Sequence, residues 1–262
     1  MSFQLRMRSA SKAALFHFLG SVLVAAMAAV LVFLVWYPHP YGLLSGGLRL
    51  FLILVAVDVV CGPLLTLVLF SPKKPRREIF TDMALVVLIQ LGALAYGMHT
   101  VYQARPLFLV HEVDRFRVIS LPDFNGDDVS AALGQLDSAL KPRPLGGPVT
   151  VGIRDPLSRE ERQDVMLESI TGGRDYAQRP EFYRPYDAAY QAKVLARAKP
   201  LQSFVQHFPE VAQEAANLVK TKGVSLENAL FLPVLHKQEW VAVMDGQARI
   251  LGFLPGDGFA VP

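Results

Sequence analysis

Three apolar stretches constrain this chain more than any other feature of its sequence. They cover residues 13–37, 50–70 and 83–103, and the first and third contain no Asp, Glu, Lys or Arg. Each has the ~20 residues that a helix needs to cross a hydrocarbon core of about 30 Å. The sequence therefore predicts a three-helix transmembrane domain at residues 1–103, followed by a separate domain at residues 104–262.

A secretory signal peptide is the alternative interpretation of the first stretch, because three basic residues precede it. The apolar run continues to Trp36, however. It is therefore longer than the roughly 7–15 apolar residues of a signal peptide. We expect this stretch to be retained as a membrane anchor.

The distribution of charge argues against a nucleic-acid partner. The whole chain has a formal net charge of +3. Residues 1–103 hold 8 Lys/Arg and 3 Asp/Glu, whereas residues 104–262 hold 18 Lys/Arg and 20 Asp/Glu. The larger domain therefore has no excess of basic residues with which to bind a phosphate backbone.

The positive charges predict how the chain lies in the membrane. Most of them flank the apolar stretches on one side, at Arg6, Arg8, Lys12, Lys73, Lys74, Arg76 and Arg77. The loop at residues 38–47 has none, and only Arg49 follows it at the membrane edge. Basic loops stay in the cytoplasm. We therefore expect a multi-pass protein of a bacterial inner membrane, with a cytoplasmic N-terminus and a periplasmic C-terminal domain.

Asp58 stands near the middle of the second apolar stretch. An unpaired charge at that depth costs about 2.5–3.5 kcal/mol on insertion scales, so such a residue is a functional candidate. The alternatives are a structural carboxyl bonded to Thr66, Gln90 or a backbone carbonyl, contact with a membrane partner, and proton or ion transport. Few other polar residues are available for a transport pathway.

Other features of the apolar stretches concern helix packing. Gly62 and Pro63 follow Asp58 by about one turn, and a proline there predicts a kink. Small residues recur at helical spacing, which lets helices approach closely; they are Ser21, Ala25 and Ala29 in the first stretch and Ala93 and Gly97 in the third. These rows serve either the protein's own bundle or another protein's helix.

The remainder of the chain has the pattern of an α+β domain. Strands are predicted at residues 107–113, 116–121, 149–153, 230–235, 240–244 and 249–254, and helices at residues 127–140, 158–170, 187–198 and 209–222. The closing short strands, separated by turn residues, predict an antiparallel sheet packed by helices. The loop at 179–186 holds Phe182, Tyr183 and Tyr186, and it is either packed irregular structure or a lip that binds a peptide.

The sequence holds no compact catalytic motif. Cys61 is the only cysteine, which excludes an intramolecular disulfide and a cysteine-based zinc site. The motifs of α/β-hydrolases, zinc proteases, P-loop proteins and dinucleotide-binding proteins are absent. We therefore expect no catalytic residues, no metal and no cofactor.

Several short motifs carry a family resemblance. They are Tyr41-Gly42-Leu43, Asp58-Val59-Val60-Cys61-Gly62-Pro63, Lys73-Lys74-Pro75, Arg105-Pro106, Glu112-Val113-Asp114-Arg115-Phe116 and Arg154-Asp155-Pro156. Together they resemble the TfpX/TfpZ family of type IV pilin accessory proteins. The resemblance covers most of the chain and is more specific in the membrane half.

This resemblance implies an inner-membrane accessory protein that supports pilin stability or pilus assembly. A pilin before assembly has one transmembrane helix and a periplasmic head, and a chaperone that contacts both would fit the expected architecture. The alternatives are a pilin-modifying transferase and a membrane-anchored sensor or regulator.

The predicted binding residues follow from this hypothesis of a pilin chaperone. They are Asp58, Gly62, Pro63, Thr66, Ser21, Ala25, Ala29, Ala93 and Gly97 for the pilin helix, and Phe182, Tyr183 and Tyr186 for its head. The expected partners are a type IV pilin and membrane lipid. The sequence leaves open whether the protein works alone or as a homo-oligomer.

Overall fold

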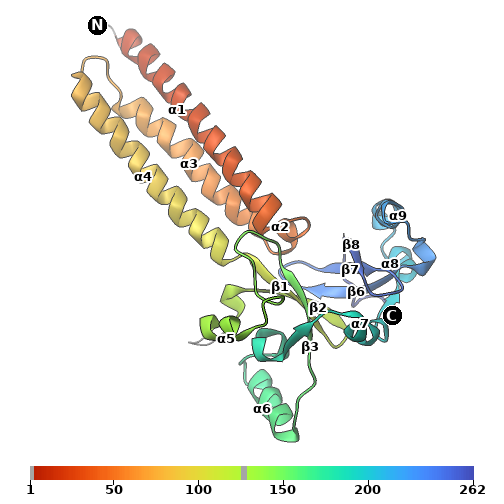
Figure 1. Cartoon of the computed structure of the whole chain (residues 1–262). Coiled ribbons are helices and arrows are strands. Elements are labelled where there is room, and N and C mark those ends of the chain that lie inside the picture. Colours follow the sequence, from red (N-terminus) through yellow and green to blue (C-terminus); the bar gives the residue numbers. More distant parts are fainter. Residues whose placement is uncertain (1–2, 125–128) are drawn as a thin grey trace. The chain divides into compact units, whose positions relative to one another are not determined.

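The computed structural model describes residues 3–124 and 129–262 of the chain. The backbone forms two compact units (Figure 1). The first comprises Met1–Gly42 and Gly47–Ala104, and the second comprises Leu43–Gly46 and Arg105–Pro262. The first unit is helical, and the second contains the sheet.

Three long helices make up most of the first unit. The helices of this part of the chain are α1 (Phe3–Leu31), its π-helical continuation η1 (Val32–Trp36), the short α2 (Tyr41–Leu44), α3 (Gly47–Leu69) and α4 (Arg76–Gln103). The spans Arg6–Trp36, Gly47–Leu69 and Arg76–Gln103 are long and apolar enough to cross a membrane. The prediction of three long apolar helices is confirmed.

The helices begin earlier than the apolar stretches that predicted them. The third stretch begins at residue 83, whereas α4 begins at Arg76. Backbone hydrogen bonding continues through polar residues at a helix end, so hydropathy identifies only the central, apolar part of each helix.

An aromatic cluster closes one end of the bundle. The rings of Trp36 and Tyr102 lie 5.0 Å apart, and the Tyr37 hydroxyl donates to the Val101 carbonyl at 2.9 Å. Gly47 allows this packing, because a Cβ at that position would collide with the Tyr37 ring. The cluster therefore joins the end of the first helix to α3 and α4.

A mixed sheet forms the centre of the second unit. Its strands are β1 (Pro106–Glu112), β2 (Arg115–Ser120), β3 (Val149–Ile153), β4 (Tyr183–Pro185), β5 (Lys199–Pro200), β6 (Leu230–Leu235), β7 (Trp240–Met244) and β8 (Ile250–Pro255). The order across the sheet is β4-β3-β1-β2-β6-β7-β8, and β5 pairs with β6.

The pairing adds two parallel contacts to the predicted antiparallel arrangement. β6, β7 and β8 form an antiparallel meander, as the closing strands predicted. β1 pairs with β3 in parallel, and so does β2 with β6. Alternation along a strand does not identify its neighbours, so these pairings between strands distant in sequence were not predicted.

Short helices surround this sheet, and α6 extends away from it (Figure 1). They are α5 (Val129–Gln135), α6 (Arg159–Ile170), α7 (Ala188–Leu195), α8 (Leu201–His207) and α9 (Ala212–Thr221). Residues 127–128, where the first of these helices was predicted to start, lie outside the described residues. α8 was not predicted, although its Leu201 and Phe204 are fully buried.

A tight turn joins β1 to β2 where the sequence predicted a longer first strand. Glu112 pairs with Arg115, so Val113 and Asp114 form the turn. Val113 has a φ of 55°, which is unfavourable for a β-branched side chain. The strand therefore ends one residue before its predicted end.

Two ionisable side chains at the end of β1 have altered proton affinity. Burial, aided by the nearby Asp175 carboxylate, raises the pKa of Glu112 to about 7. Burial lowers the pKa of His111 to about 4, and its Nδ1 lies 2.9 Å from the Tyr190 hydroxyl. The two groups therefore affect the stability of the domain in opposite directions as pH changes.

Replacing Glu112 with Gln isolates one of these effects. A carboxyl with a raised pKa binds more protons in the folded state, so its contribution to stability falls as pH rises from its ordinary 4.5 to about 7. Pulse proteolysis with urea measures the free energy of unfolding of Glu112→Gln and of the wild type. We expect the value for the variant minus the value for the wild type to increase as pH rises across this range.

The contribution of His111 is common to both proteins and cancels in this difference. The exposed Glu227 provides the control, and Glu227→Gln should show no such increase. A difference for Glu112→Gln that stays constant with pH would contradict the raised pKa.

Candidate binding site in the membrane helices

Polar side chains from all three long helices meet inside the bundle. The His17 ring of α1 lies between the Thr66 hydroxyl of α3 and the Gln90 amide oxygen of α4, with both distances 2.5 Å. The Gln90 amide nitrogen donates to the backbone carbonyl of Asp58 at 2.7 Å. This chain of hydrogen bonds joins the three helices.

The geometry explains the spacing of polar and small residues in α3. Asp58, Gly62 and Thr66 lie four residues apart and are all buried. Residues at this spacing share one face of a helix. A Cβ at Gly62 would overlap the Gln90 side chain, so the glycine is what lets the amide reach the Asp58 carbonyl.

A cavity of about 250 Å³ opens beside this chain of hydrogen bonds. Small residues of α1, including Ser21 and Ala25, form one wall, and Asp58 and Gln90 supply polar atoms. Apolar residues such as Val55 and Leu94 complete the lining. The cavity is therefore mostly apolar, with a few polar groups in its lining.

The carboxyl group of Asp58 is left without a bond in this arrangement. Asp58 is 9% exposed. No group in the described parts of the chain donates a hydrogen bond to its side chain. Of its two polar neighbours, Gln90 donates to its backbone carbonyl and Thr66 bonds to His17. The predicted structural bond from Gln90 or Thr66 to this carboxyl is thus not formed. A carboxyl in apolar surroundings is stabilised when a partner bonds to it.

The other predicted membrane residues have different surroundings. Pro63 lies inside α3, which continues past it to Leu69. Ala29 packs beside the aromatic cluster, and a Cβ at Gly97 would collide with Leu54 of α3. Ala93 is exposed. The structure thus brings Ser21 and Ala25 to the cavity and gives Gly97 a packing contact within the bundle.

His17 is the residue that the sequence analysis missed. It precedes Ser21 by four residues and Ala25 by eight, so its position on the same helical face was readable. Its hydrogen-bond partners on α3 and α4 could not be predicted from the sequence. Among the described residues, no group of three or more His, Cys, Asp and Glu side chains is placed to hold a metal ion.

The basic residues used to predict orientation gather at one end of the bundle. The N-terminus of α1 and the connection from α3 to α4 lie together there (Figure 1). Arg6 donates to the Val68 carbonyl at 3.2 Å, and Lys74 lies 2.6 Å from the Asp82 carboxylate. The exposed basic side chains at this end are Arg6, Arg8, Lys12, Lys73, Arg76 and Arg77.

The three aromatic residues predicted to contact a pilin head pack inside the C-terminal domain. Phe182 is 2% exposed and Tyr183 is 8% exposed. The Tyr183 hydroxyl donates to the Ala177 carbonyl at 2.5 Å, and the Tyr186 hydroxyl donates to the Ala248 carbonyl at 2.8 Å. Their role in partner binding stays a prediction.

Two glycines provide a matched test of the packing around Gln90. Gly62→Ala and Gly92→Ala each add one methyl group to a helix, which by itself favours the helix by up to ~1 kcal/mol. A Cβ at Gly62 would overlap Gln90, whereas a Cβ at Gly92 would meet no atom within 4 Å. We expect Gly62→Ala to destabilise the bundle by about 1–3 kcal/mol.

Thermal unfolding of the full-length protein in detergent would measure the difference between these variants. Gly92→Ala should melt at the wild-type temperature or above it. Equal melting temperatures for the two variants would show that the Gln90 contact does not constrain α3.

Comparison with known proteins gives a consistent set of relatives. The family model of the fimbrial assembly protein FimB matches residues 5–46. A fimbrial assembly protein of Dichelobacter nodosus serogroup I is 36% identical over 253 residues, which cover 95% of this chain and 96% of that protein. The serogroup E1 protein is 35% identical over 253 residues with the same coverage.

A third relative matches a shorter segment. The fimbrial assembly protein of serogroups C1 and C2 of the same organism is 44% identical over 123 residues, which cover 47% of this chain and 94% of that protein. No solved structure matches the chain significantly.

Proposed function

Because the chain belongs to the fimbrial assembly protein family, we propose that it is an inner-membrane accessory protein that binds a type IV pilin and acts as its chaperone during pilus assembly. The motifs that resemble the TfpX/TfpZ family support the same role. The membrane helices receive the transmembrane helix of the pilin, and the C-terminal domain contacts the pilin head in the periplasm.

The unbonded carboxyl of Asp58 carries this proposal. It lies beside a cavity whose α1 wall is built from Ser21 and Ala25. Small residues let another helix approach closely, and hydrogen bonds across helices add to the association. A pilin helix that packs against this face and offers a hydrogen-bond donor at this depth would place a side chain in the cavity and satisfy the carboxyl.

This role requires binding and no chemical reaction. The hydrogen bonds of His17 connect helices of the protein's own bundle, so the imidazole serves as a structural link. In the absence of the accessory protein, the pilin helix would lose the packing that shelters it before assembly. The expected consequence is an unstable pilin of unchanged covalent mass.

Two adjacent alanines provide a matched test of the helix site. Ala25 lines the cavity, whereas Ala26 is exposed on α1. Ala25→Leu places a larger side chain in the cavity, and Asp58→Asn removes the charge of the carboxyl while keeping its shape. We expect each to lower the amount of pilin that co-purifies by about tenfold, equivalent to ~1.4 kcal/mol of binding free energy.

Ala26→Leu is the control for this experiment and should recover pilin at the wild-type level. Thermal unfolding of each variant checks that the bundle is intact. Equal recovery of pilin by the wild type, Ala25→Leu and Asp58→Asn would refute the helix site.

The orientation has its own test. Basic residues at the end of the bundle that holds the N-terminus favour a cytoplasmic location for that end. We expect alkaline phosphatase, which is active only in the periplasm, to be active when fused after Pro262. Activity of a cytoplasm-specific reporter at that position would reverse the topology and remove the proposed contact with the pilin head.

A further inference from the structure

A second cavity, of about 560 Å³, opens within the C-terminal domain. It lies where the parallel strands β1 and β3 end, and residues 111–113 and 153–156 line it there. α6 and α7 supply the other walls. We call this cavity the β1/β3 groove. In sheets of this kind, ligands commonly bind beyond the carboxyl ends of parallel strands, and its volume is typical of a ligand site.

The walls of the groove expose apolar side chains. Val113 is 68% exposed, Met166 is 60% exposed and Ile170 is 74% exposed. Next to them, Leu157 and Leu167 are 83% and 62% exposed. Single exposed apolar residues are ordinary, but a group of them around a cavity indicates a binding surface. The apolar surface also extends beyond the cavity itself, which suits an elongated ligand.

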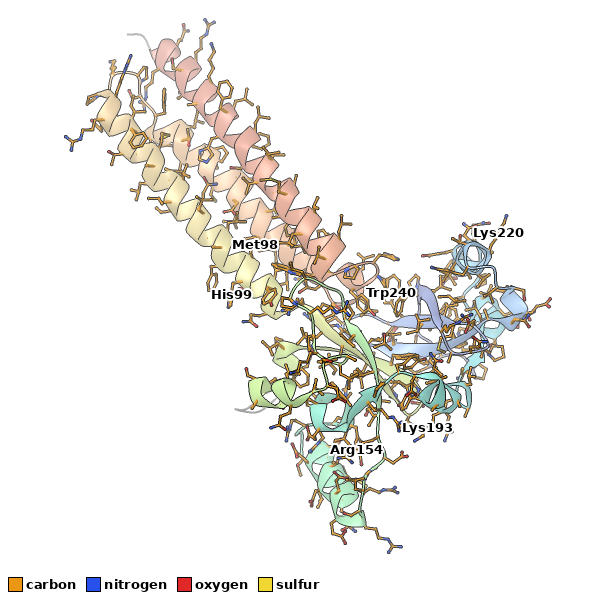
Figure 2. The ribbon with its side chains drawn as sticks, in the orientation of Figure 1. Met98, His99, Arg154, Lys193, Lys220 and Trp240 are labelled. Atoms are coloured by element: carbon orange, nitrogen blue, oxygen red, sulfur yellow. The ribbon has the colours of Figure 1, made fainter. Side chains whose placement is uncertain are left out.

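Most charged side chains of the groove are already paired. Arg154 binds Glu161 at 2.7 Å, and Lys193 binds Asp155 at 2.7 Å. Figure 2 labels these two basic residues in the C-terminal domain. Asp175 is bound by the Arg117 guanidinium at 3.2 Å. These pairs leave little charge for a ligand.

Two guanidinium groups of the groove differ from the rest. Arg162 of α6 and Arg197, just beyond α7, are exposed, and the guanidinium group of neither forms an ion pair or a hydrogen bond within the described part of the chain. Arg162 influences the Asp155 carboxylate only at longer range. The groove therefore combines apolar walls with two guanidinium groups that are available to a carboxylate.

We infer that the β1/β3 groove binds an extended segment of the pilin head in which an acidic side chain lies beside apolar ones. Arg162 and Arg197 bind the carboxylate, and the exposed residues of α6 cover the apolar side chains. Guanidinium–carboxylate bonds are among the stronger hydrogen bonds in proteins and favour a defined orientation. The inference rests on the proposed function, because that function makes the pilin the client.

A peptide-binding experiment tests the charge complementarity. The full-length protein is placed in phosphatidylcholine nanodiscs, and overlapping fluorescent peptides that cover the pilin head are added. Fluorescence anisotropy should identify one peptide, or two overlapping ones, containing Asp or Glu. The double variant Arg162→Glu, Arg197→Glu should bind that peptide at least about tenfold more weakly, since each lost charge-assisted bond contributes about such a factor.

Two lysines at the C-terminal end of α9 provide the control, one in the helix and one just beyond it. Lys220 and Lys222 are exposed, and Lys220 projects from a different part of the domain than Arg154 and Lys193 (Figure 2). Lys220→Glu, Lys222→Glu changes the net charge equally and should leave binding unchanged. Wild-type affinity in the arginine double variant, or equal binding of a peptide whose acidic residue is changed to its amide, would overturn the inference. So would displacement of the peptide by phosphatidylglycerol vesicles.

Photocrosslinking in cells separates this inference from the proposed function. A photoreactive amino acid is placed at Met166 in the groove, at Ala25 in the membrane cavity, or at the exposed Gln213 of α9 as a control. We expect crosslinks to pilin from the first two positions and not from the third. Crosslinks from position 25 alone would refute binding at the groove but support the helix site. The absence of crosslinks from both positions would refute the proposed function as well.

Discussion

The hydrogen bonds from His17 through Gln90 to the Asp58 carbonyl join three helices whose apolar surfaces alone give them little preference for one another over lipid. Lipid chains are as apolar as the helix surfaces, so the hydrophobic effect contributes little to helix packing in a membrane. Close contacts and interhelical hydrogen bonds must supply the difference. The hydrogen bond from Gln90 to the Asp58 carbonyl depends on Gly62, because a larger residue would keep Gln90 away from α3.

The same arrangement produces the candidate site. Gln90 and Thr66 are the polar neighbours that the Asp58 carboxyl needs, and both are occupied elsewhere. The hydrogen bonds that stabilise the bundle therefore also leave the Asp58 carboxyl without a partner. The proposed binding of a pilin helix, and its later release, would benefit from a single unsatisfied group, because one hydrogen bond adds specificity without making binding irreversible.

The C-terminal domain depends on different physics. Its stability comes from apolar side chains removed from water, in one cluster around Phe108 and Val151 and another around Phe204 and Phe231. Where this burial is incomplete, on α6, apolar side chains remain exposed beside Arg162. The proposed binding at this surface would use apolar contact and charge, whereas the proposed binding at the membrane cavity would use shape and one hydrogen bond.

The amino-acid sequence by itself determined the features that depend on near neighbours in the chain. Hydropathy identified the three long helices, and short apolar runs bounded by turn residues identified β3, β6 and β7 with their observed ends. The Ser158-x-x-Glu161 spacing is typical of a helix start, and the Ser158 hydroxyl accepts from the Glu161 amide at the start of α6. Only the tertiary structure decided which polar groups meet. Periodicity assigns a residue to a face of a helix, but the residue that it contacts there comes from another part of the chain. The packing of the helices therefore decided that Gln90 and Thr66 bond to His17. It also decided that the Asp58 carboxyl has no partner.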